Sequence, residues 1–155
     1  MRRRDIRVDA TTTAAPEVVY GLLADGSTWP AWSAIESVEI ERPGDDPPEG
    51  VGAIRVNKKG RTTGRDEILE LVPNRRLKYA TLSGLPFHDY IGEVDLESAP
   101  GGGTTIRWHS SFEPKYAGTG WIMQRGLLRF LGENVRGLAD YAAKTGAPNT
   151  NVEHT

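Results

Sequence analysis

The sequence has no cysteine among its 155 residues. This absence excludes a disulfide framework, a catalytic thiol and a thiolate metal site. The chain also lacks an apolar run long enough to cross a membrane as a helix. The three arginines after Met1 are not followed by an apolar segment, so we expect neither a signal peptide nor integral membrane association. We therefore predict a cytoplasmic protein whose fold depends on its hydrophobic core.

An excess of one charge is lacking too. The chain has 19 Lys and Arg against 21 Asp and Glu, a net charge of −2, which gives no drive toward nucleic acid. It contains no dinucleotide fingerprint, phosphate-binding glycine loop or His-x-x-x-His pair, so we predict no cofactor. Asp45 and Asp46 are adjacent, but no His or further carboxylate stands at ligand spacing. We predict no metal site.

One long segment, Thr119 to Thr145, has the periodicity of an amphipathic helix. Its apolar residues recur at steps of three and four, at Leu127, Leu128, Leu131, Val135, Leu138 and Ala142. Gly146 follows where the helix should end. Within the segment, Gly126, Gly132 and Gly137 each cost up to about 1 kcal/mol relative to alanine. These glycines indicate a local need for close packing or for space.

The chain before this helix is predicted to be mostly strand. After the first strand, residues 15–25 and 27–33 favour two short helices. Alternating apolar and polar residues, bounded by turn formers, predict strands at Arg2–Thr12, Ile35–Arg42, Gly52–Lys58, Thr62–Val72, Arg76–Ser83, Tyr90–Ser98 and Thr104–Glu113. Short connections between them favour hairpins. The predicted class is α+β, with a curved antiparallel sheet of six to seven strands wrapped around a long C-terminal helix.

This order resembles the START-like, helix-grip superfamily (SRPBCC), and within it the polyketide cyclase/dehydrase-like family. The similarity runs from Ile6 to Ala143 and rests mainly on three segments: Ala14–Tyr20 followed by Trp29 and Trp32, Glu70–Leu77, and the glycine-rich turn before Thr105–Trp108. We expect one such domain over residues 1–146 and a disordered polar tail at 147–155. The segments mark a fold rather than a reaction, because the superfamily includes enzymes, carriers and regulators.

The resemblance implies a cavity between the sheet and the long helix, lined by inward strand residues and the inner helix face. The predicted ligand-binding residues are Trp32, Ile54, Val56, Tyr79, Tyr90, Trp108, Phe112, Gln124, Leu128 and Leu131. Each apolar member could instead serve only to pack the core.

Three polar residues are candidates for catalysis: Arg65, His88 and Tyr90. Arg65 and Asp66 face opposite sides of one predicted strand, and each face mixes charged with apolar residues, so the sequence leaves the inward side open. An inward Arg65 would bind a carboxylate or stabilise an enolate, as aromatase/cyclase relatives use a cavity arginine, whereas an outward one would be solvated. His88 is a possible general base. A buried Tyr90 could equally be structural, with a single hydrogen-bond partner.

Three functions remain open. We favour binding of a hydrophobic small molecule, such as a lipid, a polyketide or an aromatic compound, in the cavity. The alternatives are a cofactor-independent polyketide cyclase, aromatase or dehydratase acting in the same cavity, and a protein-interaction module of the chaperone-activator type. A uniformly apolar cavity would favour the carrier and converging polar groups the enzyme. The oligomeric state stays open between monomer and homodimer.

Overall fold

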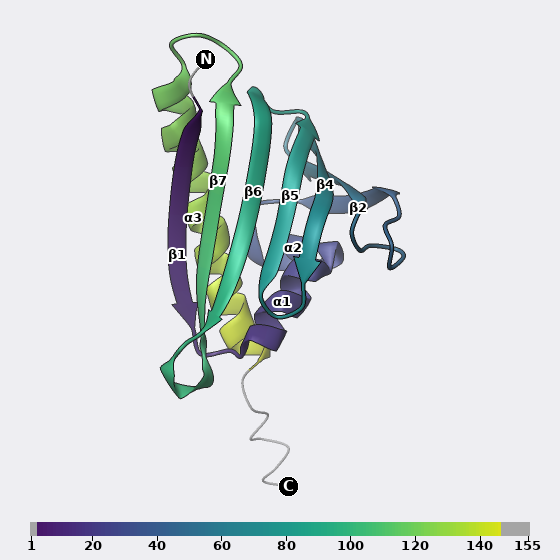
Figure 1. Ribbon diagram of the computed structural model, residues 1–155, viewed down its shortest axis with the longest axis vertical. Helices are drawn as coiled ribbons and strands as arrows, with labels where there is room; N and C mark the ends of the chain where they lie inside the picture. The colour runs from purple at the N-terminus through teal and green to yellow at the C-terminus, as the bar shows by residue number, and fades with distance from the viewer. Residues whose placement is uncertain (1–2, 147–155) are drawn as a thin grey trace, which may run out of the picture.

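The computed structural model describes residues 3–146 and contains one seven-stranded antiparallel sheet with helices packed on one face (Figure 1). The order across the sheet is β1-β7-β6-β5-β4-β3-β2. The strands are β1 (Arg4–Thr12), β2 (Ser37–Arg42), β3 (Ile54–Lys59), β4 (Thr62–Val72), β5 (Arg76–Ser83), β6 (Phe87–Ser98) and β7 (Thr104–Pro114). The predicted α+β class and strand number are confirmed. The tail predicted at residues 147–155 lies outside the described residues.

The helices are α1 (Pro16–Ala24), α2 (Trp29–Trp32) and α3 (Gly120–Thr145), with short 3₁₀ turns η1 (Gly26–Thr28) and η2 (Pro100–Gly102). Pro16 begins α1, where its missing N–H leaves no helical bond unmade. The Asp25 carboxylate accepts a hydrogen bond from the Ser27 backbone N–H at 3.0 Å and so starts η1. The two short helices predicted after the first strand are therefore present.

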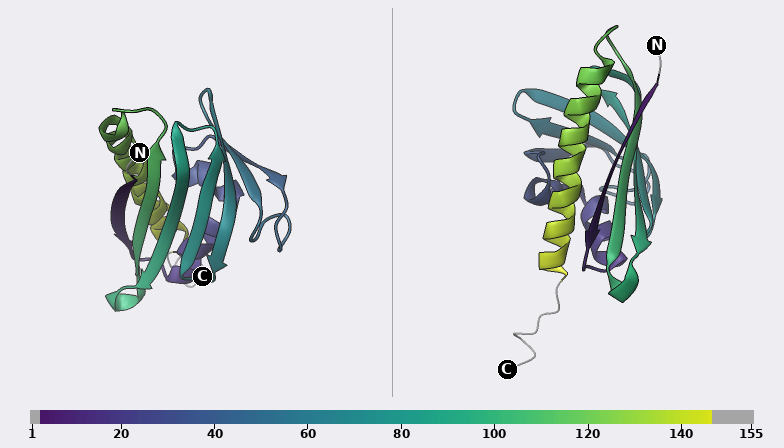
Figure 2. Two further views of the ribbon diagram at one scale, coloured as in Figure 1. Left: turned by 45° about the horizontal axis from the view of Figure 1, so that its top comes forward. Right: turned by 90° about the vertical axis from the view of Figure 1, so that its left-hand side faces the viewer.

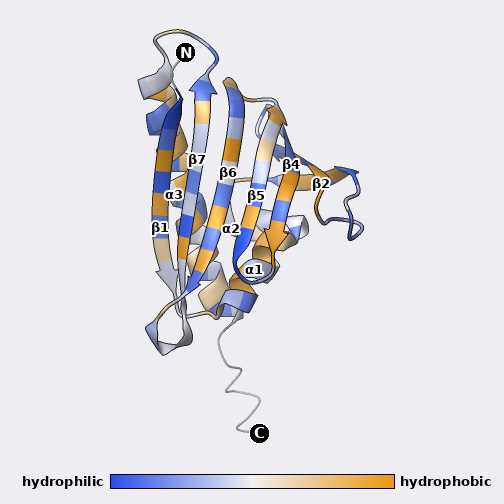
Figure 3. Ribbon diagram, viewed as in Figure 1, coloured by the Kyte–Doolittle hydropathy of each residue, from blue (hydrophilic) through white to orange (hydrophobic). Residues whose placement is uncertain are grey.

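Alternation along the strands produces a buried and a solvated sheet face. In β7, Ile106, Trp108 and Phe112 are fully or almost fully buried, while Arg107 and His109 point to the other side and are half-exposed. Figure 3 shows the same alternation of hydrophobic and hydrophilic residues along β6 and β1. The helices cover only the apolar face, so the sheet's outer face meets solvent.

Helix α3 packs along β1 and β7 at one side of the sheet, as the right-hand view of Figure 2 shows. Its own residues Leu131, Val135 and Leu138 are buried. A Cβ at Gly137 would lie 1.9 Å from the backbone oxygen of Trp32, so this glycine permits close contact between α3 and α2. None of the helices within residues 3–146 is long and apolar enough to cross a membrane.

Three tryptophans fill the centre of the core. The ring centroids of Trp29 and Trp32 are 4.6 Å apart, and Trp108 lies 5.7 Å from Trp29 and 6.3 Å from Trp32. The indole N–H of Trp29 donates to the Leu23 carbonyl at 3.1 Å, and that of Trp32 donates to the Thr28 hydroxyl at 3.2 Å. Each buried N–H thus has a partner, as a buried indole requires.

One strand begins earlier than the sequence predicts. β6 starts at Phe87 rather than Tyr90, and its pairing with β7 is irregular between His88 and Ile91. Asp89 has a positive φ of 51° there, a conformation that Asp tolerates better than most residues. Because of this irregularity, the alternation of apolar and polar residues could not identify where β6 begins.

Candidate functional site

A pocket of about 450 Å³ lies between the first half of α3 and the strands β3 to β6. Its volume is in the range of small-molecule sites. The lining residues are Ile35, Asn57, Lys59, Thr62, Gly64, Asp66, Tyr79, Thr81, Leu85, Pro86, Phe87, Tyr90, Ile122, Met123, Gly126, Leu127 and Phe130. The pocket opens to solvent at one side, because α3 packs on β1 and β7 and leaves this half of the sheet less covered.

The helix side of the pocket is apolar. Ile122, Met123, Leu127 and Phe130 line it, and they surround Gly126 on one helix face because residues three and four apart share a face. A Cβ added at Gly126 would meet no atom within 4 Å other than the helix's own nearby backbone and the two chain neighbours. Gly126 therefore leaves open space on the pocket wall, in contrast to Gly137, which permits close packing.

The sheet side has a polar group centred on Asp66. One carboxylate oxygen of Asp66, Oδ1, accepts a hydrogen bond from the Thr81 hydroxyl at 2.7 Å. The other, Oδ2, accepts from the side-chain amide of Asn57 at 2.6 Å. These three residues come from adjacent strands, β4, β5 and β3, and all three line the pocket. They form a polar floor in an otherwise mostly apolar site.

Burial raises the pKa of the Asp66 carboxyl from 3.8 to about 6, although hydrogen bonds from Thr81 and Asn57 and the charge of Arg55 act in the opposite direction. Desolvation dominates because it penalises the charged form, and protein atoms surround the carboxyl on all sides but the pocket. Asp66 can therefore accept or release a proton close to neutral pH.

Two tyrosines complete the polar end of the pocket. The Tyr79 hydroxyl accepts a hydrogen bond from the Trp108 indole N–H at 3.1 Å. The Tyr90 hydroxyl shares a 2.8 Å hydrogen bond with the Ser110 hydroxyl. Burial raises the pKa of Tyr90 to about 12 and that of Tyr79 well above 10, so both phenols are neutral at physiological pH.

Of the ten predicted ligand-binding residues, only Tyr79 and Tyr90 line the pocket. Trp32, Trp108, Phe112 and Leu131 are buried in the core behind it, where they pack against neighbouring side chains. The sequence pattern identified them correctly as inward-facing. It could not separate the core from the pocket wall, because both are apolar and share one face of the sheet.

Ile54 and Val56 were predicted to face inward, and this prediction is wrong. Their β3 neighbours Arg55 and Asn57 are the inward residues: the Arg55 side chain is 4% exposed, and Asn57 lines the pocket. Because strand side chains alternate, Ile54 and Val56 lie on the outer sheet face, where Ile54 is nevertheless only 5% exposed. The pattern misled because a buried ion pair places a charged residue inside.

Leu128 and Gln124 also lie away from the pocket. Leu128 is 37% exposed, because a helix turns about 100° per residue and Leu128 therefore falls one step beyond the stripe that includes Leu127 and Leu131. Gln124 points to β1 instead: its side chain accepts a hydrogen bond from Arg4 at 2.9 Å and donates one to the Asp5 carbonyl at 3.2 Å.

Arg65 and His88 are not pocket residues either. Arg65 faces outward and pairs with Glu41, with 2.8 Å between Nε and Oε1, because Asp66 takes the inward position on β4. His88 is exposed on β6 opposite Glu113. The candidate catalytic set is thereby reduced to Tyr90. Asp66, Asn57 and Thr81, which sequence reasoning did not select, are the polar residues that meet in the pocket.

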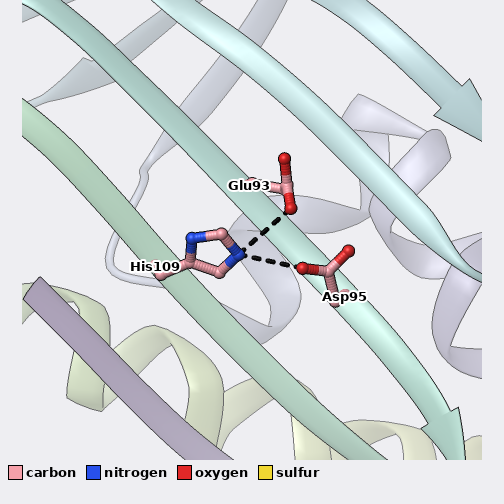
Figure 4. A group of neighbouring side chains, drawn as sticks. All are labelled: Glu93, Asp95 and His109. Atoms are coloured by element: carbon pink, nitrogen blue, oxygen red, sulfur yellow. Dashed lines mark hydrogen bonds and ion pairs between the residues drawn. The ribbon is translucent and has the colours of Figure 1, made fainter.

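A second polar group, Glu93, Asp95 and His109, lies on the outer sheet face (Figure 4). The sequence had led us to predict no metal site. His109 Nε2 is 2.9 Å from Asp95 Oδ2 and 3.1 Å from Glu93 Oε2, so these side chains could hold a cation. Arg76 already lies 2.7 Å from Asp95. Burial favours a higher pKa for Asp95, but hydrogen bonds from Arg76 and His109 outweigh it and lower the pKa. Glu93 of β6 and His109 of β7 are cross-strand partners. Sequence reasoning did not predict this pairing and therefore did not identify the group.

Comparisons with known proteins agree with this fold. The chain resembles the protein XoxI from Bacillus cereus, with 13% identity over 97% of this chain and 99% of that one and a TM-score of 0.76. It resembles Ara h 8.0201, with 17% identity, 92% and 99% coverage and a TM-score of 0.72. An uncharacterised protein from Bacillus thuringiensis has 14% identity, 90% and 98% coverage and a TM-score of 0.74. At these identities the likeness concerns the fold alone.

No curated protein matches the chain. A family model does match, and its match spans residues 3–143, from the start of β1 almost to the end of α3. The chain belongs to the family described as polyketide cyclase / dehydrase and lipid transport.

Proposed function

We propose that the protein binds a hydrophobic small molecule in the pocket between α3 and strands β3 to β6. The observation that carries this proposal is the composition of the pocket, in which the apolar side chains of α3 face a small polar group on the sheet. An apolar cavity with a few convergent polar groups is the common form of a small-molecule site. The family's description as one of cyclases and lipid-transport proteins supports the same reading.

The proposal is tested with a neutral fluorescent probe, N-phenylnaphthylamine, titrated into the wild type and Gly126→Leu. The wild type should give a saturable rise in fluorescence. A leucine at position 126 would occupy space beside Met123 and Phe130, because a Cβ there meets nothing within 4 Å. We expect it to weaken probe binding at least tenfold.

Gly21→Leu is the matched control. Gly21 lies in α1, is exposed, and would also accept a Cβ without contact within 4 Å. Both substitutions replace a helical glycine, so neither should lower stability. The control should bind the probe like the wild type. Unsaturable fluorescence in the wild type would overturn the binding proposal, and equal weakening in both variants would place the binding elsewhere.

A cyclase or dehydratase reaction is the second candidate, because one ionisable carboxyl and two phenols lie at one end of the pocket. Asp66, with its pKa of about 6, has the range of a general base that works near neutral pH. Tyr79 and Tyr90, both neutral, could donate hydrogen bonds to a carbonyl oxygen. No arginine lines the pocket among residues 3–146.

The two functions differ in turnover. Incubation with a linear poly-β-ketone thioester, followed by mass spectrometry for loss of water, would detect cyclisation with dehydration. Loss of that turnover by a hundredfold or more in Asp66→Asn, with probe binding retained, would establish the enzyme. No product from the wild type leaves binding as the function.

A further inference from the structure

We propose that Asp66 makes the pocket selective for hydrophobic ligands whose buried end carries a hydrogen-bond donor, above all a protonated amine. This inference rests on the proposed binding function and adds the chemical class of the ligand's polar group.

The Asp66 carboxylate has unused acceptor capacity. Its two oxygens offer about four lone-pair directions, and within residues 3–146 they accept one hydrogen bond each, from Thr81 at 2.7 Å and Asn57 at 2.6 Å. Both bonds come from neutral donors, and both hold the carboxylate in one orientation. A ligand donor that reaches the floor of the pocket would find a fixed, anionic acceptor.

The charge of Asp66 is also poorly balanced. Arg55 is its cross-strand partner, but the Arg55 guanidinium is bound by Glu49, with 2.6 Å between Nη2 and Oε1. It also donates to the carbonyl oxygens of Leu23 and Ala24 at 3.0 and 2.9 Å. Arg55 therefore acts on Asp66 only through space. A buried charge without a direct counter-charge is costly, and a ligand ammonium would supply that counter-charge.

The charge of Asp66 also disfavours an anionic ligand group at the floor of the pocket. A ligand carboxylate on the floor would place two anions side by side, and like charges in a desolvated site repel strongly. The cation of the lining is Lys59, whose Nζ lies 5.1 Å from the ring centroid of Phe130, and Lys59 is exposed. A fatty acid held with its carboxylate at Lys59 and its chain inward is the competing arrangement.

The test compares three ligands of one chain length, decylamine, decanol and decanoate, each below its critical micelle concentration, as competitors of bound N-phenylnaphthylamine at pH 7.5. We expect decylamine to compete best and decanoate worst, at least tenfold apart. Asp66→Asn should weaken decylamine at least tenfold and change decanol less than threefold. Asp140→Asn, an exposed aspartate on α3, is the control and should behave like the wild type.

The wild type alone supplies a second measurement if Asp66→Asn folds poorly. At pH 5 most of the Asp66 carboxyl is protonated in the free protein, since its pKa is about 6, so the preference for decylamine over decanol should shrink. The other ionisable groups around it are Arg55, Lys59, Tyr79 and Tyr90. Burial raises the pKa of both tyrosines, so the two phenols stay neutral between pH 5 and 7.5.

The outcomes separate this inference from the function on which it rests. Equal competition by all three ligands would overturn the selectivity and leave hydrophobic binding intact. Tightest binding by decanoate, lost in Lys59→Met, would replace the inference with the opposite orientation. An unchanged preference at pH 5 would also contradict it. Failure of the probe itself to bind would instead remove the proposed function.

Discussion

Arg55 and Glu49 form a buried ion pair that joins three parts of the chain. Arg55 Nη2 lies 2.6 Å from Glu49 Oε1, and the two side chains are only 4% and 14% exposed. The other Glu49 oxygen accepts the Gly26 backbone N–H at 2.7 Å, and Arg55 binds the last carbonyls of α1. The pair thus holds the loop before β3 against the end of α1.

Glu49→Ala should be strongly destabilising, because it leaves the Arg55 charge buried without its partner. Breaking a buried pair from one side costs about 3–5 kcal/mol. Glu133→Ala is the control, since it removes the exposed Arg129–Glu133 pair, 3.6 Å apart, and should cost less than about 1 kcal/mol. Urea denaturation measures both. Similar losses for the two variants would mean that the Arg55–Glu49 pair is solvated.

The same pair explains why the sequence pattern predicted the wrong inward-facing residues in β3. Alternation identified β3 correctly, but the rule that apolar residues face inward assigned Ile54 and Val56 to the cavity. The inward residue Arg55 is paired with Glu49, which lies in the loop between β2 and β3. A long-range partner of this kind cannot be read from the period of a single strand.

The buried face of the long helix was easier to predict from the sequence, because its apolar stripe repeats over several turns. Leu131 and Leu138 are buried as the stripe predicts, at 1% and 0% exposure. The polar group of the pocket was harder to predict, because no repeating pattern marks it. Asp66 is one polar residue on a strand whose two faces both mix charge with apolar groups, and its partners Asn57 and Thr81 come from other strands.

Two leucines of α3 test the helix assignment. Leu131→Ala should lower the free energy of unfolding by about 2–5 kcal/mol, because it opens a cavity in a packed core. Leu128→Ala removes the same atoms from a side chain that is 37% exposed and should cost much less. Urea denaturation of both variants under one condition measures the two losses. A larger loss at Leu128 would show that the helix is rotated from the orientation described above.

Gly92→Ala should disturb the pocket through Tyr79. The two residues are cross-strand partners, and a Cβ at Gly92 would lie 2.2 Å from Tyr79 Cζ. The ring must move and loses its hydrogen bond with Trp108, so we expect a loss of about 1–3 kcal/mol and weaker probe binding. Thermal melts and probe titration measure the two effects.

Gly64→Ala is the control for the loss of stability, because its Cβ would come no nearer than 4.0 Å to the Ser83 carbonyl. It should alter stability by less than about 0.5 kcal/mol. Tyr79→Leu in the Gly92→Ala background should relieve the clash, so the two losses should not add. Strict additivity would argue against contact between residues 79 and 92.

The last prediction concerns the pH dependence of stability. The pKa of Asp66 is raised in the folded protein to about 6, against 3.8 ordinarily, so the folded state holds this proton more tightly than the unfolded state. The Asp66 contribution to stability is therefore full below about pH 3.8, decreases as the pH rises to about 6, and is constant above that.

The difference between these two pKa values corresponds to at most about 3 kcal/mol, and access from the pocket reduces it. Asp66→Asn has no such titration. Its stability relative to the wild type should therefore improve by one to a few kcal/mol between pH 4 and pH 7, in urea denaturation at both values. Comparing the two proteins cancels the effect of other carboxylates that titrate in this window, such as Glu93, whose pKa is raised by burial. A difference that stays constant with pH would mean that the Asp66 carboxyl is solvated in the folded protein.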